Sequence, residues 1–136
     1  MNTITHTNPN GKTVQVNVGE HVTIGENVTI GKNVTIGEHA TIGENSYIGR
    51  SSNIYKNVTI GSYSNIGEHA NIGRNVNIGR SSYIGSYSNI GSYSNIGNNA
   101  TVGEHATIGE HATIGEYVTI GEHATIDRDT TIGPDA

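Results

Sequence analysis

Residues 18–48 read VGEHVTIGENVTIGKNVTIGEHATIGENSYI, and the pattern in this run is the main evidence for the fold. A branched aliphatic residue returns at every sixth position from Val18 to Ile132, with no insertion or deletion. Glycine follows each of these residues except at Tyr55 and Asp127. Chance does not maintain a six-residue period over so long a stretch, so the repeat has to be interpreted before the composition.

Within each hexad the side chains alternate as they do in a β-strand. In Val22-Thr23-Ile24 the outer two side chains point to one face and Thr23 points to the other. We therefore expect very short strands, with a small and a bulky residue inward and Thr, Asn or Tyr outward. We expect each repeat glycine to form a corner with a positive φ. The residue two positions after it, often Asn or His, suits the same turn because these types tolerate positive φ.

This pattern predicts an all-β fold, a triangular β-solenoid with three strands and three corners in each coil of 18 residues. A helix is excluded because glycine and β-branched residues recur too often. The predicted solenoid covers residues 18–136 in about six to seven coils, spaced at about 4.8 Å. Residues 1–17 break the hexad pattern, and we expect them to form an N-terminal cap or lead-in segment with a turn at residues 8–11.

The Ile-Gly-x-x-[Ser/Thr/Ala/Val]-x units from Val18 to Ala136 resemble the hexapeptide-repeat superfamily. The resemblance implies a left-handed parallel β-helix, whereas general chirality rules would favour right-handed crossovers. The unit Gly-Glu-His-Ala-Thr-Ile occurs four times, at 103–108, 109–114 and 121–126 and also at 37–42. Such near-identity suggests an idealised or engineered member of the superfamily, or recent duplication.

Composition and charge limit the classes of partner. The net charge is -5 and there is no basic block, so we expect neither nucleic acid nor an anionic membrane as a partner. The chain has no cysteine, which excludes disulfides and cysteine-based metal or redox sites. The segment from Met1 to Lys12 lacks the apolar stretch of a signal peptide, and no stretch is long and apolar enough to span a bilayer. We therefore expect a soluble, cytoplasmic protein.

The resemblance also raises the question of catalysis. Many superfamily members are acyltransferases that use coenzyme A or acyl-carrier protein, and others resemble γ-class carbonic anhydrases with zinc held between the subunits of a trimer. In the acyltransferases a catalytic His works beside loops that break the repeat. This sequence has no such break, and it ends at Ala136 without the C-terminal extension of those enzymes. We expect no enzyme activity, no catalytic residue and no cofactor, and we identify no small-molecule substrate. We interpret the chain as a structural scaffold, with an acyltransferase or γ-carbonic-anhydrase relative that acts as a trimer as the alternative.

Histidine is the residue type that most invites a functional interpretation. Six of the seven histidines occupy the second corner position, where His can simply replace Asn: His21, His39, His69, His105, His111 and His123. Residues 18 apart lie on adjacent coils, so His21 faces His39 and His105 faces His123. Each of these four follows a glutamate, and the pairs are candidates for adventitious divalent-metal sites. A carbonic-anhydrase site would need three converging imidazoles, and His105 and His111 lie at different corners.

Two surfaces suggest other roles. The outward position is rich in Thr near both ends of the repeat, and regular Thr columns on a β-solenoid resemble those of ice-binding proteins. The ends of a solenoid carry unpaired backbone edges, and its faces are flat. Self-association through the ends or the flat faces is therefore the partner interaction that we expect.

Overall fold

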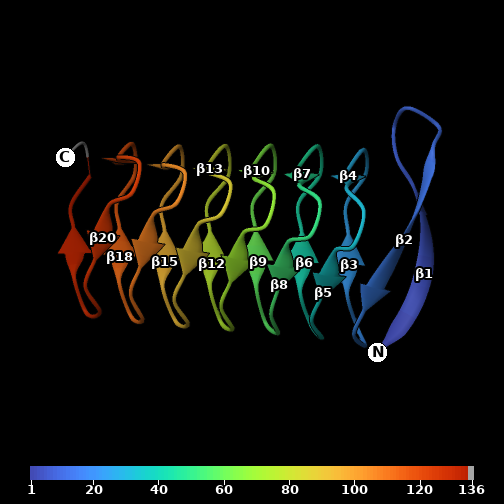
Figure 1. Cartoon of the computed structure of the whole chain (residues 1–136), viewed down its shortest axis with the longest axis horizontal. Coiled ribbons are helices and arrows are strands. Elements are labelled where there is room, and N and C mark those ends of the chain that lie inside the picture. The colour runs from blue at the N-terminus through green and yellow to red at the C-terminus, as the bar shows by residue number, and fades with distance from the viewer. Residues whose placement is uncertain (135–136) are drawn as a thin grey trace.

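In the computed structural model, which describes residues 1–134, the chain forms a rod of stacked coils (Figure 1). From β2 to β18 each strand pairs in parallel with the strand one coil later, so that Ile66 lies opposite Ile84. The rod has about 18 residues per turn and about six turns. These features confirm the predicted all-β solenoid and its 18-residue coil.

The strands form three sheets, which are the three sides of the rod. Sheet A contains, in order, β1 (Asn2–Thr7), β2 (Thr13–Val18), β5 (Thr35–Ile36), β8 (Asn53–Ile54), β11 (Asn71–Ile72), β14 (Asn89–Ile90), β17 (Thr107–Ile108) and β20 (Thr125–Ile126). Sheet B contains β3 (Thr23–Ile24), β6 (Thr41–Ile42), β9 (Thr59–Ile60), β12 (Asn77–Ile78), β15 (Asn95–Ile96), β18 (Thr113–Ile114) and β21 (Thr131–Ile132). Sheet C contains β4 (Thr29–Ile30), β7 (Tyr47–Ile48), β10 (Asn65–Ile66), β13 (Tyr83–Ile84), β16 (Thr101–Val102) and β19 (Thr119–Ile120).

The core is a column of isoleucines that runs along the axis of the rod. The hexad aliphatic residues from Ile30 to Ile120 are buried, and the small residue two positions before each of them is buried with it. Burying one Ile side chain stabilises the fold by about 1.5–3 kcal/mol. The outward position carries Thr, Asn or Tyr, as the strand alternation predicted.

Six of the small inward residues are serines, and each buried hydroxyl has a backbone partner. Every one donates a hydrogen bond of 2.7–3.0 Å to the carbonyl oxygen of the glycine 15 residues later, on the next coil. The residues are Ser46, Ser52, Ser64, Ser82, Ser88 and Ser94. These bonds allow a polar residue in the core without an unpaired donor.

The prediction that the repeat glycines have a positive φ is wrong. Within residues 1–134 the only glycine with a positive φ is Gly11, which lies outside the repeat. Positive φ falls on the residue two positions after each repeat glycine from Gly19 to Gly121, as at Asn99 with a φ of 60°. The glycines are needed for a different reason, which is close contact between coils. A Cβ added to Gly97 would lie 2.6 Å from the nitrogen of Glu116 on the next coil.

An antiparallel hairpin of β1 and β2 covers the first coil (blue in Figure 1). Its Asn8 side chain binds both backbone groups of Ile30: Oδ1 accepts from N at 2.9 Å and Nδ2 donates to O at 3.1 Å. His6 Nε2 lies 2.8 Å from the carbonyl oxygen of Val28. These contacts occupy backbone groups at the edge of β4.

The hairpin coincides with the segment predicted as a cap or lead-in. Strand β2 belongs both to the hairpin and, through its pairing with β5, to sheet A. The division between residues 1–17 and 18–136 stays a prediction, and positions 135–136 of the predicted solenoid lie outside the described residues.

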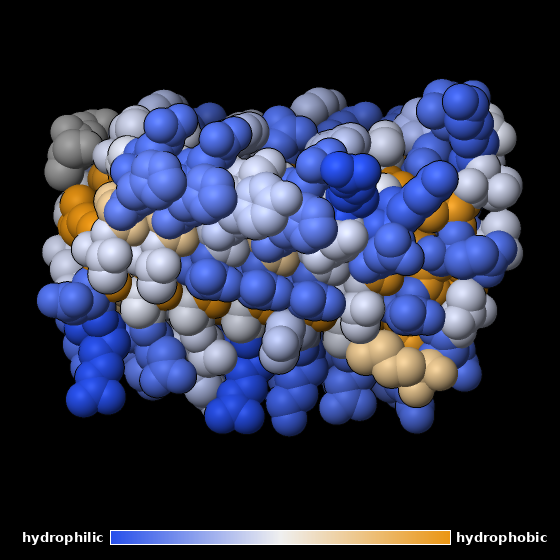
Figure 2. Space-filling model, viewed as in Figure 1, coloured by the Kyte–Doolittle hydropathy of each residue, from blue (hydrophilic) through white to orange (hydrophobic). Residues whose placement is uncertain are grey.

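The face shown in Figure 2 is largely hydrophilic, with apolar side chains visible in narrow strips and toward the ends. In the part of the chain that the structure describes, no helix is long and apolar enough to cross a membrane.

Candidate functional site

The corner residues with positive φ form three columns along the edges of the rod. Residues 18 apart occupy the same column, because the strands between them pair in register. Corner column 1 contains His21, His39, Asn57, Asn75, Tyr93, His111 and Asp129. Corner column 2 contains Asn27, Asn45, Tyr63, Ser81, Asn99 and Tyr117, and corner column 3 contains Asn33, Ser51, His69, Tyr87, His105 and His123. The six corner histidines thus divide equally between columns 1 and 3.

The rings of neighbouring coils stack along these columns. His21 and His39 have ring centroids 5.0 Å apart and an angle of 17° between their planes. The pair His105 and His123 has the same centroid distance with 9° between planes. Both pairs were predicted from the sequence, because their members are 18 residues apart.

Tyrosines extend the stacks beyond what we predicted. Tyr87 lies between His69 and His105, with centroid distances of 4.8 Å and 5.0 Å, so four rings from His69 to His123 form one continuous ladder on column 3. On column 1, Tyr93 stacks on His111 at 5.0 Å. The predicted stacks contained only histidines, although the same 18-residue spacing connects these tyrosines to them.

The stacked geometry does not suit a closed metal site. The lone pairs of an imidazole lie in the ring plane, so two nearly parallel stacked rings direct their nitrogens side by side and not toward a common ion. Within residues 1–134 no group of three or more His, Cys, Asp or Glu side chains could hold a metal ion. Adventitious binding at His21, His39, His105 and His123 stays a prediction.

Charged residues next to the columns form few ion pairs. Arg50 Nε lies 3.5 Å from Glu68 Oε1, and Glu20 Oε2 lies 3.8 Å from His21 Nε2. All four side chains are substantially exposed, and exposed pairs contribute only about 0–1 kcal/mol. The corner columns therefore lack the buried, interacting charges typical of catalytic sites.

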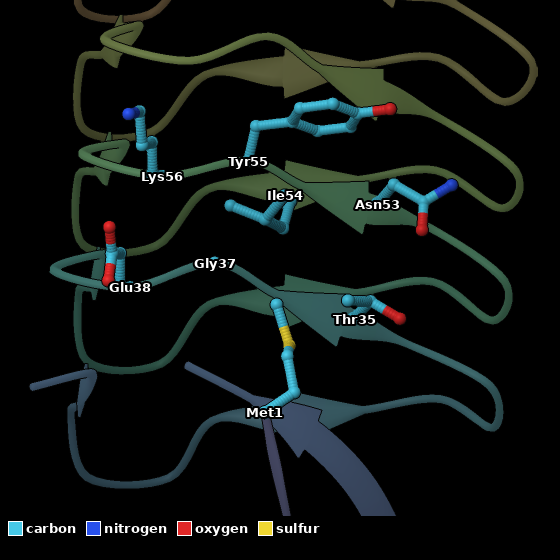
Figure 3. Close-up of a pocket in the computed structure, with 8 residues that line it drawn as sticks. All are labelled: Met1, Thr35, Gly37, Glu38, Asn53, Ile54, Tyr55 and Lys56. Atoms are coloured by element: carbon cyan, nitrogen blue, oxygen red, sulfur yellow. The ribbon is translucent and has the colours of Figure 1, made fainter. Parts of the chain in front are cut away.

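Tyr55 stands where the repeat has glycine, and it borders a hollow of about 460 Å³ on sheet A (Figure 3). Met1, Gly37, Asn53 and Lys56 also line this hollow, and the Met1 side chain extends toward Gly37. The sequence showed the exception at Tyr55 but not the hollow. Thr35, Glu38 and Ile54 complete the lining of this hollow.

Comparison with known proteins identifies the repeat. The family model described as bacterial transferase hexapeptide (six repeats) matches residues 15–50, 39–74 and 105–136. The chain belongs to this hexapeptide-repeat family. The left-handed parallel β-helix implied by the sequence pattern is therefore confirmed. No curated protein sequence matches the chain.

Solved structures of hexapeptide-repeat proteins share the fold at low identity. The acetyltransferase domain of PglB from Neisseria gonorrhoeae is 20% identical with a TM-score of 0.69, over 82% of this chain and 54% of that one. A putative acetyltransferase from Bacillus cereus is 22% identical with a TM-score of 0.60, over 86% and 72%. A UDP-N-acetylglucosamine acyltransferase from Bacteroides fragilis is 25% identical with a TM-score of 0.59, over 87% and 56%. The present chain thus spans about half the length of the PglB domain.

Proposed function

We propose that this hexapeptide-repeat chain is a structural scaffold without a catalytic site, which self-associates through its ends or flat faces. The observation that supports the proposal is the regular spacing of the strands. From β3 to β21 a strand begins at every sixth residue, so no loop leaves the rod in the part that the structure describes. A catalytic pocket has to exclude water and orient its substrate, and a smooth rod offers no loop to do so.

Three measurements on one sample test the proposal. We expect no release of coenzyme A from acetyl-CoA with amino-sugar acceptors, no bound metal by elemental analysis, and a particle size in light scattering that grows with protein concentration. Coenzyme A release that is lost when all six corner histidines are replaced by Asn would overturn the absence of catalysis. A constant monomer over the whole concentration series would overturn self-association.

A transferase is the second candidate, and the family itself favours it. The structural relatives described above include acetyltransferases and an acyltransferase. In this hypothesis the active unit is a trimer, and histidines act at the seam between subunits. A γ-carbonic-anhydrase relative would likewise need a trimer, with zinc bound by histidines of neighbouring subunits. A trimer that contains zinc, or one that turns over an acyl carrier, would support these alternatives against the scaffold.

Ice binding is a third candidate, favoured by the outward column of sheet B. This column contains only Thr and Asn: Thr23, Thr41, Thr59, Asn77, Asn95, Thr113 and Thr131. The array is one residue wide in each strand. Thermal hysteresis that disappears in a Thr59→Tyr variant would support ice binding, and an absence of hysteresis at high protein concentration would eliminate it.

We also propose that the repeat is idealised or engineered. The four copies of Gly-Glu-His-Ala-Thr-Ile and the uniform hexad length support this origin. Idealised backbones are typically hyperstable, so we expect a Tm above about 90 °C. A Tm in the range of ordinary mesophilic domains, about 45–65 °C, would contradict it.

A further inference from the structure

Two tyrosines on sheet C flank a single asparagine. Tyr47 in β7 lies in register with Asn65 in β10, and Asn65 lies in register with Tyr83 in β13. All three occupy the outward position of their strands, and each tyrosine is 42% exposed. The two tyrosines are separated by two coils, which corresponds to about 9–10 Å at the usual strand spacing.

These residues border one hollow of about 250 Å³, which Ser86 and Glu68 complete at the neighbouring corner. The ladder on column 3 shows how far apart rings on adjacent coils lie, and this distance can be compared with the gap between Tyr47 and Tyr83. Rings on adjacent coils of column 3 stack with centroids 4.8–5.0 Å apart. The Asn65 side chain is shorter than a tyrosine side chain and has no ring. The column Tyr47, Asn65, Tyr83 therefore has a gap of one ring at its centre. A guest ring inserted there would lie one coil from each tyrosine, at about 4.7–4.9 Å, a distance at which aromatic rings interact.

The floor of the hollow is an amide that can recognise the edge of such a ring. Asparagines elsewhere bond to each other along the rod: Asn53 donates to Asn71 at 3.0 Å, and Asn71 donates to Asn89 at 2.9 Å. Asn65 has a tyrosine on either side, so it cannot join a ladder of this kind. Its carbonyl and NH₂ groups can therefore pair with a donor and an acceptor on a ligand.

The charge around the hollow limits the ligand further. Glu68 at its rim is paired with Arg50, so the repulsion of anions comes from the chain as a whole, which carries a net charge of -5. An anionic ligand such as a nucleotide would be repelled, whereas an uncharged ring would not. We propose that Tyr47, Asn65 and Tyr83 form a clamp for one uncharged, planar heteroaromatic ring that presents a donor beside an acceptor, as adenine does. This binding activity goes beyond the scaffold role, and either proposal can fail without the other.

NMR titration with adenosine tests the clamp, with ribose as the control for the sugar. We expect saturable binding with a dissociation constant on the order of 1 mM, since each stacked aromatic contact contributes modestly. The expected signature is an upfield ring-current shift of the adenine protons, with chemical-shift changes at Tyr47, Asn65 and Tyr83. Ribose alone should leave these signals unchanged.

Variants identify the contacts. Tyr47→Thr and Tyr83→Thr should each weaken adenosine binding about tenfold, and Thr already occupies this column at Thr101 and Thr119. Asn65→Tyr supplies the missing ring, so it should abolish binding while the rod stays folded by circular dichroism. Tyr117→Asn, which removes an exposed tyrosine from corner column 2, should have no effect.

Three outcomes would overturn the clamp: no shift at saturating adenosine, equal losses in Tyr117→Asn and Tyr83→Thr, or unchanged binding in Asn65→Tyr. Tyr47 and Tyr83 signals that move with protein concentration and not with adenosine would also overturn it, because the guest would then be a side chain of a second copy.

Discussion

The imidazole rings of His105 and His123 lie one coil apart, with their centroids 5.0 Å apart and 9° between their planes. The backbone sets this geometry, because both residues have a left-handed conformation, with φ of 59° and 62°. Equal backbone angles on stacked coils direct equal side chains in parallel. The corner columns can therefore stack rings at the surface of the rod without a hydrophobic pocket.

The central ring of the column 3 ladder should contribute to stability. Tyr87→Asn removes stacking with both His69 and His105 and retains a residue suited to positive φ. Tyr117→Asn makes the same exchange at a corner where no stacked ring is described. We expect Tyr87→Asn to lower the free energy of unfolding by about 1 kcal/mol more than Tyr117→Asn does, in urea denaturation. Equal values for the two variants would show that the stacking contributes nothing.

Close contact between coils makes the repeat glycines intolerant of a side chain. In Gly97→Ala the new Cβ would lie 2.6 Å from Glu116 N and 2.7 Å from Gly115 C, so the coils have to separate. We expect a loss of about 1–3 kcal/mol, as for overpacking elsewhere, measured as a lower urea midpoint. The matched control is Gly121→Ala, where no described atom lies within 4 Å of the added Cβ. A similar loss in both variants would point to backbone conformation and not to contact between coils.

The buried serines should be more stabilising than their size suggests. Ser64 Oγ donates to Gly79 O at 2.9 Å and accepts from the backbone nitrogen of Ser82 at 3.3 Å. Ser64→Ala removes both bonds, so we expect a loss of about 1 kcal/mol in urea denaturation. Ser62→Ala, at a more exposed corner position, is the control and should change stability by less than about 0.5 kcal/mol. A neutral Ser64→Ala would mean that the two backbone groups find other partners.

The Asn8 side chain should contribute to the attachment of the hairpin to the first coil. Asn8→Ala removes both hydrogen bonds to Ile30, so we expect faster hydrogen exchange at the Ile30 amide and along β1. Thr3→Ala removes only an exposed side-chain bond to Asn17 and serves as the control. Because the change frees the edge of β4, light scattering should show more association of the Asn8→Ala variant. Unchanged exchange at Ile30 would show that the His6 contact with Val28 and the pairing of β2 hold the hairpin in place without Asn8.

Much of the fold could be predicted because the repeat has no insertions. A fixed period of six with strand alternation assigns Ile66 inward and Asn65 outward without any three-dimensional information. The 18-residue coil then places His21 on His39. The features that could not be predicted correctly include contacts between coils. Glycine was assigned to positive φ, whereas Gly97 is needed for close approach to Glu116, and the partners of the buried serines could not be identified.

The sequence by itself determined which residues face the core, which face outward and which coils are neighbours, because these follow from the strand alternation and a constant repeat length. Only the tertiary structure decided which atoms meet across the gap between coils. Those contacts depend on the exact placement of individual atoms on neighbouring coils, which the spacing of residue types does not encode. The glycine contacts, the Ser64 hydrogen bond to Gly79, the ring ladder through Tyr87 and the Asn8 contact with Ile30 are all of this kind.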